Sequence, residues 1–116
     1  MWALNPSYAV SEAKKQKVAD GRNSAGELSY TYLPKSSQKT VGKYVVPKGT
    51  KKGNEAAAQA LAYANDTGKT TIVHVVWWSD AEAIAEKVDL AKELGIAGVA
   101  IFKIDGGEDK NIWKLF

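Results

Sequence analysis

One stretch, residues 70–113, constrains the fold of this chain more than any other. It begins with a continuous β-branched and aromatic run at residues 70–78, which is typical of a strand covered on both faces. The apolar residues that follow recur at the three-to-four spacing of one helix face, and a second apolar run at residues 96–104 ends in an Asp-Gly-Gly turn. This pattern predicts a strand, a helix and a second strand.

Both ends of the predicted helix carry termination signals. Ser79 is placed to accept a hydrogen bond from a free backbone amide of the first turn, and Glu82 completes a capping box. Gly95 supplies the left-handed residue that commonly ends a helix. The helix is therefore expected between Ser79 and Gly95.

The first 69 residues predict two helices and two strands. Alternation of side chains indicates a half-buried strand at residues 28–33. Residues 41–46, which Pro47 follows, indicate a second strand, and the two strands are expected to form an antiparallel pair. One helix is expected over residues 8–20, with Ser7 as its cap and Gly21 at its end. The other is expected over residues 55–64, with Asn54 as its cap.

The C-terminal tail, residues 111–116, is amphipathic and is expected to be helical and to dock through Trp113 and Phe116. Together these elements favour a single domain, residues 1–116, of the α/β to α+β class. At 116 residues the chain is too short for a complete (β/α)₈ barrel of about 250 residues.

Composition excludes several classes of protein. The chain has no cysteine, which excludes disulfides and thiolate metal sites. No apolar run reaches the ~20 residues that cross a bilayer, and the N-terminus lacks the pattern of a secretory signal. No membrane partner is therefore expected.

The two halves of the chain differ in charge. Residues 1–53 contain ten Lys or Arg and three Asp or Glu, whereas residues 54–116 contain six and ten. A basic half of this kind has two explanations. It can be a solvated lysine-rich surface, or it can bind an anionic polymer through residues 14–52, and the affinity for that polymer would then fall steeply with added salt. Arg22 is the only arginine, and base-reading or phosphate-clamping surfaces usually use arginine forks, which argues against nucleic-acid binding.

Isolated candidates for chemistry have structural explanations. His74 lies inside a predicted strand, where a hydrogen bond to a backbone carbonyl would account for it, and one histidine without cysteine cannot form a usual zinc site. Asp105 belongs to a turn, and Glu108 and Asp109 complement the dipole of a following helix, although carboxylates after a strand can also serve a glycosidase. No catalytic residue, metal site or cofactor is predicted.

Trp77 and Trp78 are adjacent on a predicted strand, so their rings face opposite sides of it. One ring can belong to the core while the other offers a flat apolar platform on which a sugar ring can stack. Core packing and sugar binding both remain open for this pair.

Several fragments occur in a fixed order in the C-terminal part of the chain: Val76-Trp77-Trp78-Ser79-Asp80-Ala81, Lys87, Gly95-Ile96-Ala97-Gly98-Val99, Phe102, Gly107-Glu108-Asp109 and Trp113. As an ordered set they resemble the C-terminal end of a family 18 glycoside hydrolase. The likeness is to the chitinase-like enzymes, which include spore-wall and peptidoglycan types.

The resemblance implies an insertion-type α+β module at residues 9–78 and the last helix and strand of a (β/α)₈-type barrel at residues 79–116. It places the strands at 70–78 and 96–104 in different sheets, whereas the general strand–helix–strand rule favours parallel neighbours. It also implies an extracellular or cell-wall location and an N-acetylglucosamine-containing glycan as ligand. The expected glycan contacts are Trp77, Trp78, Phe102, Asp105, Tyr30 and Tyr32.

Two departures from the family pattern limit this expectation. The acidic motif Asp-x-x-Asp-x-Asp-x-Glu is absent, so no residue is available to protonate a glycosidic oxygen, and Phe102 stands where the family usually has a tryptophan. We therefore expect a non-catalytic fragment or derivative of such an enzyme.

The alternative is a small protein-interaction or assembly domain. Unpaired strand edges and an uncovered apolar face drive oligomerisation. The partner would be the remainder of a barrel or another copy of the chain, and a homodimer would bury the face that carries Phe102.

Overall fold

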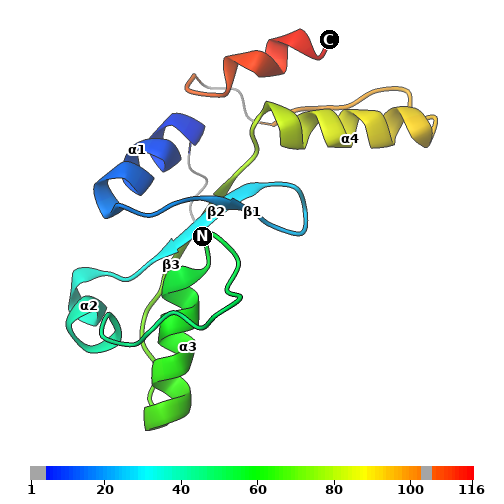
Figure 1. Ribbon diagram of the computed structural model, residues 1–116. Coiled ribbons are helices and arrows are strands. Elements are labelled where there is room, and N and C mark those ends of the chain that lie inside the picture. The colour runs from blue at the N-terminus through cyan, green and yellow to red at the C-terminus, as the bar shows by residue number, and fades with distance from the viewer. Residues whose placement is uncertain (1–4, 103–105) are drawn as a thin grey trace.

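The computed structural model describes residues 5–102 and 106–116 and shows a small α+β protein (Figure 1). Four α-helices and one short 3₁₀ helix surround a three-stranded antiparallel sheet in this described part. In chain order the elements are α1 (Pro6–Gln16), β1 (Gly21–Arg22), β2 (Leu28–Tyr32), α2 (Lys35–Val41), α3 (Glu55–Thr67), β3 (His74–Trp78), α4 (Ala81–Glu93) and η1 (Lys110–Lys114).

The sheet has the order β1-β2-β3, with β2 in the middle. Tyr30 of β2 lies opposite Val76 of β3, and pairing proceeds without a bulge along all five residues of each strand. The predicted strand at 28–33 is thus confirmed, but its predicted partner at 41–46 is wrong. Val41 is the last residue of α2, which starts where the Pro34 carbonyl accepts the amides of Ser37 and Gln38, and residues 42–46 form a turn and a loop.

One face of the sheet packs on α1. The buried residues of this cluster are Ala9, Ala13, Tyr30, Val76 and Trp78. Tyr30 meets the Trp78 ring edge-on, with the ring centroids 5.9 Å apart, and its hydroxyl donates to the carbonyl oxygen of Ala9 at 3.0 Å. The small side chains of α1 allow this close approach, because alanine leaves room for the two aromatic rings.

The opposite face of the sheet is covered at β2 by α3. A second buried cluster contains Leu33, Val41, Ala56 and Ala60 and links α2 to α3. The amide of Thr31 donates to the carbonyl of Gly53 at 2.6 Å, which ties the start of α3 to the middle strand. The alanine-rich α3 confirms the predicted helix at 55–64 and extends it to Thr67.

The residues that begin the helices differ from those predicted in two cases. Asn5, not Ser7, caps α1 by accepting the amide of Ser7 at 2.9 Å, and Pro6 occupies the first turn. α1 then ends at Gln16, four residues before the predicted end, because Lys17 adopts the left-handed conformation with φ 53°. Asp80, not Ser79, caps α4 through the amide of Ala83.

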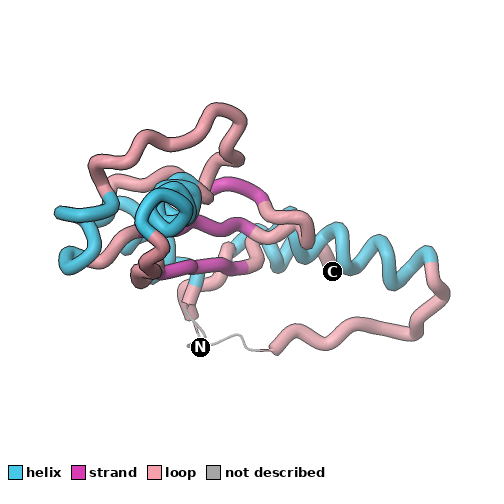
Figure 2. Tube along the Cα trace, turned by 90° about the horizontal axis from the view of Figure 1, so that it is seen from below, coloured by secondary structure: helices cyan, strands magenta, loops and turns pink. Residues whose placement is uncertain are grey.

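The second predicted strand of the strand–helix–strand unit is not formed in residues 96–102. Gly95 ends the helical path as predicted, with φ 66°, and the amide of Ile96 closes the turn on the carbonyl of Ala91 at 2.9 Å. The chain then runs back beside α4 as an extended segment that pairs with no described strand (Figure 2). The structure therefore fits the general α+β class and not a fragment of a barrel, and the relation expected between strands 70–78 and 96–104 does not arise.

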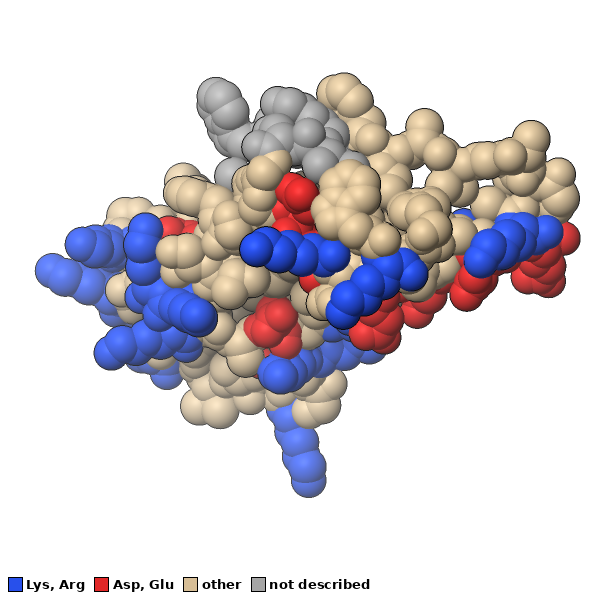
Figure 3. Space-filling view, turned by 90° about the horizontal axis from the view of Figure 1, so that it is seen from above, with Lys and Arg blue, Asp and Glu red and all other residues tan. Residues whose placement is uncertain are grey.

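The molecule is elongated, because α4 and its returning segment project from the sheet and its helices. Its radius of gyration is 16.9 Å, and its principal extents are 52, 28 and 22 Å. A compact chain of this length would have a radius of gyration of about 13 Å. Charge is unevenly distributed along the long axis: Lys side chains gather at one end, whereas the projecting arm carries Asp and Glu side by side with Lys (Figure 3).

Candidate interaction surface

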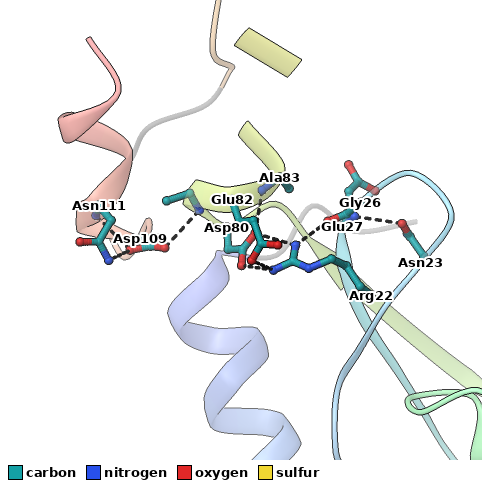
Figure 4. Close-up of polar contacts among 10 residues, drawn as sticks. Arg22, Asn23, Gly26, Glu27, Asp80, Glu82, Ala83, Asp109 and Asn111 are labelled. Carbon is teal, nitrogen blue, oxygen red and sulfur yellow. Dashed lines mark hydrogen bonds and ion pairs between the residues drawn. The ribbon is translucent and has the colours of Figure 1, made fainter. Parts of the chain in front are cut away.

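An ion-pair cluster joins the sheet to the start of α4 (Figure 4). Arg22 of β1 donates to the two carboxylate oxygens of Asp80 at 3.0 and 2.8 Å and to Glu82 at 2.7 Å. The same guanidinium donates to the carbonyl of Gly26 at 2.5 Å. The hydrogen bonds from Arg22 hold the pKa of Asp80 below its ordinary value. We call Arg22, Asp80 and Glu82 the anchor cluster.

A second set of contacts ties the loop between β1 and β2 to α4. Glu27 accepts from Lys87 Nζ and from Ser79 Oγ, each at 3.2 Å. Burial is the largest single effect on Glu27 and by itself would raise the pKa of its carboxyl group. The hydrogen bonds from Lys87, Ser79 and Asn23 together outweigh burial, so the pKa of Glu27 lies below its ordinary value. Ser79 therefore serves this contact rather than the helix cap that the sequence suggested.

Asp109 connects the tail to the same end of α4. Its carboxylate accepts the amide of Asn111 at 3.0 Å, which caps η1, and the amide of Ala81 at 3.1 Å (Figure 4). These two backbone amides lower the pKa of Asp109. The prediction that Asp109 supports a helix start is thus confirmed. The tail docks through Ile112, which is 2% exposed, and not through Trp113 and Phe116 as expected.

Beyond these anchors, α4 and residues 96–102 present an apolar surface that the described residues leave largely uncovered. Val88 and Ala91 of α4 are buried, but larger apolar side chains around them are not. The exposed fractions are 52% for Leu90, 65% for Leu94, 56% for Ile96, 43% for Val99 and 96% for Phe102. We call these five residues the apolar arm.

A shallow cavity of about 200 Å³ lies between α4 and the returning segment. It is lined by Ser79, Ile84, Lys87 and Val88 and by residues 99–102. Small-molecule sites usually enclose about 300–1,000 Å³. This cavity is therefore better explained as loose packing of the returning segment on α4 than as a ligand pocket.

Three of the six predicted glycan contacts lie together on the face of the sheet that packs on α1. Tyr30 and Trp78 are buried at 0% and 6% exposure. Tyr32 is half-buried, and its ring stacks on His74 with the centroids 4.9 Å apart. Tyr30 and Trp78 hold the core together and cannot also contact a sugar.

Of the other three predicted contacts, the two that the structure describes are not brought together with them. Trp77 points to the opposite face of the sheet and is 43% exposed, so the predicted split of the tryptophan pair is confirmed. Phe102 lies on the apolar arm, and Asp105 lies outside the described residues. The five predicted contacts that the structure describes therefore do not form one site.

The anchor cluster is the feature that sequence reasoning missed. Arg22 and Asp80 are 58 positions apart, so no local spacing connects them. The available signal was the single arginine of the chain, facing an acidic first turn of a predicted helix.

Within residues 5–102 and 106–116, no three His, Asp or Glu side chains group in a way that could hold a metal ion. None of the helices described is long and apolar enough to cross a membrane. Comparisons of the chain with protein-family models, with curated proteins and with solved structures found no significant match.

Proposed function

We propose that this chain is a protein-assembly module that forms a homodimer by burying its apolar arm. The observation that carries this proposal is the amount of exposed surface. A compact monomer of 12.5 kDa exposes about 6,200 Å², whereas this chain exposes 8207 Å². The excess of about 2,000 Å² matches the share of surface that each subunit buries in an obligate homodimer.

The chemistry of the exposed surface supports the same function. Homodimer interfaces are more apolar than the remaining surface and depend on a few large side chains near their centre. Phe102, almost fully exposed at 96%, is the strongest candidate for such a central residue. Elsewhere on the same arm, Val99 and Leu94 add exposed aliphatic surface, whose contact with water is unfavourable.

A twofold arrangement also suits the shape of the arm. The arm is a helix with an extended segment beside it, and two such layers can be related by a dyad so that each Phe102 packs on the α4 of its partner. An isologous interface of this kind closes after two copies and does not lead to fibres. A dimer is therefore the expected state.

The test is the solution mass of three proteins by light scattering: the natural chain, Phe102→Glu and Leu61→Glu. Leu61 is the control, because it is 62% exposed but lies on α3, away from the arm. The natural chain and Leu61→Glu should have twice the mass of 12.5 kDa, and Phe102→Glu should be a monomer with unchanged circular dichroism. A monomeric natural chain would contradict the proposal.

A second candidate function is glycan binding, as a non-catalytic derivative of a family 18-like glycoside hydrolase. The observation that favours it is Trp77, whose half-exposed ring lies on the same strand face as the exposed Val75. Aromatic faces of this kind offer sugars a flat apolar contact. The candidate ligand is an N-acetylglucosamine-containing polymer.

Titration of a ¹H–¹⁵N spectrum with chitooligosaccharide tests this second function. Saturable shifts of the Trp77 indole signal and of the β3 backbone amides that survive moderate salt would support it. Trp77→Ala should abolish the shifts of the β3 amides, while Trp113→Ala should not. Trp113 is the matched control because it is also exposed, at 56%, but lies in η1. Absence of any shift would refute glycan binding at Trp77.

A further inference from the structure

Six exposed lysines gather on α1 and α2, away from the apolar arm. They lie along α1 and its C-terminal cap, and along α2 and the residue that follows its cap: Lys14, Lys15, Lys17, Lys35, Lys39 and Lys43. Figure 1 places α2 and the C-terminal end of α1 on the same side of the molecule, where Figure 3 shows a dense group of Lys side chains. We call these six residues the basic end.

The basic end has little acidic compensation. Among the described residues, its one ion pair joins Lys15 to Glu12 at 3.5 Å. Asp80 and Glu82 are engaged with Arg22, and Glu27 is engaged with Lys87, so these carboxylates do not compensate the basic end. The charge asymmetry of the sequence thus becomes a local accumulation of unpaired positive charge.

The three lysines of the α2 region form a row. Lys35, Lys39 and Lys43 are spaced by four residues, so they lie on one side of the helical path, each about 6 Å further along its axis. Val41 and Ser37 are buried on the other side. Like charges at this spacing repel one another, and an anionic chain laid along the row would remove that repulsion.

We propose that the basic end binds the phosphate backbone of a nucleic acid without sequence specificity. A nucleic-acid strand presents one phosphate per 3.4 Å of duplex axis, which is dense enough to match a lysine row with ~6 Å steps. Arg22 is held in the anchor cluster, so no arginine fork is available to contact base edges. That absence excludes specific base contacts but not phosphate neutralisation, for which lysine is suited as a compact point charge.

The test is fluorescence anisotropy of a labelled 20-base-pair duplex DNA with the intact chain over a series of salt concentrations. Neutralising about six phosphates predicts that log K falls with log salt at a slope of about −5, with Kd between about 10⁻⁶ and 10⁻⁴ M at physiological salt. The variant Lys35→Gln, Lys39→Gln, Lys43→Gln should make the slope shallower by about 2 to 3. Heparin serves as a second ligand, because it is polyanionic but carries no phosphate.

A matched control removes three lysines elsewhere: Lys92→Gln, Lys110→Gln, Lys114→Gln. These three are also exposed, and their removal changes net charge by the same amount. The control should keep the slope of the natural chain. Equal losses in the two triple variants would show a general charge effect and overturn the proposal, as would binding of heparin without binding of DNA. The outcome does not depend on the dimer, since Phe102→Glu should bind the duplex with the same slope per chain.

Discussion

Asp80 shows how one side chain can determine both the start and the position of a helix. Its carboxylate accepts the amide of Ala83 at 3.0 Å and also pairs with Arg22, so the residue that begins α4 is the residue that holds α4 on the sheet. The side chain is only 20% exposed, which strengthens the ion pair relative to a fully solvated one.

Asp80→Asn should make stability less dependent on acid pH. Arg22 lowers the folded-state pKa of Asp80, so its stabilisation is fully present above the ordinary aspartate pKa and is lost as pH falls through the lowered value. Asparagine keeps a capping oxygen but loses the charge. Urea unfolding should show a loss of about 1.5–3 kcal/mol at pH 7 that shrinks as pH falls below the ordinary aspartate pKa and disappears below the lowered pKa of Asp80.

Asp89→Asn is the control for this experiment. Asp89 lies on the same helix and pairs with Lys92, but its side chain is 75% exposed, and such surface pairs contribute little. A loss for Asp89→Asn as large as that for Asp80→Asn would contradict the structural role given to the anchor cluster.

Lys17→Gly should stabilise the protein. Lys17 has φ 53°, a left-handed conformation that costs a side-chain-bearing residue about 1–2 kcal/mol and costs glycine almost nothing. Lys15→Gly should instead destabilise α1 by about 1 kcal/mol, because Lys15 lies inside the helix. Thermal unfolding of the two variants should therefore shift the midpoint in opposite directions, and shifts of the same sign would refute this assignment of the cap.

At the scale of elements, two glycines with positive φ differ in how much the stability of the fold depends on them. Gly53, with φ 90°, lies where α3 meets the sheet, and an added Cβ would lie 2.5 Å from the carbonyl oxygen of Ser29. Gly95, with φ 66°, ends α4 in open space with nothing within 4 Å of an added Cβ. The first junction positions two elements, and the second only reverses the chain.

Gly53→Ala should therefore be much more damaging than Gly95→Ala. For Gly95→Ala the cost is the strain of a positive φ, about 1 kcal/mol. For Gly53→Ala the same strain is joined by a clash with the backbone of β2, so a loss of about 3 kcal/mol or more is expected. Chemical unfolding measures both; equal losses would show that the contact between Gly53 and Ser29 is not tight.

At the scale of the whole molecule, the sheet with its helices and the projecting arm differ in how much of their surface is covered. The sheet has buried clusters on both faces, whereas the arm leaves most of its large apolar side chains exposed. In the proposed homodimer the arm becomes the best-covered part of the surface, so its amides should gain protection on association.

Amide hydrogen exchange should detect this difference. In the monomeric variant Phe102→Glu, amides of α4 near Leu90 and Leu94 should exchange much faster than those of β2. In the natural chain the α4 amides should slow markedly while the β2 amides change little. Equal exchange at α4 in the two proteins would contradict burial of the arm between copies.

Sequence alone determined the elements whose stability comes from local pattern. The alternation in β2, the alanine-rich α3, the helix α4 with its Gly95 terminus and the opposite directions of Trp77 and Trp78 all follow from periodicity and backbone geometry. Short-range rules were sufficient there because the interactions involved lie within about one helical turn or one strand.

Only the tertiary structure decided the features that depend on distant partners. Residues 96–102 have the composition of a strand but do not pair with one among the described residues, because the free edge they would need is not beside them. Likewise, the contact of Arg22 with Asp80 depends on where the hairpin meets α4, and that contact reassigns the helix cap from Ser79 to Asp80. A strand and an ion pair each need a partner in space, and sequence spacing does not specify where a partner 58 positions away will lie.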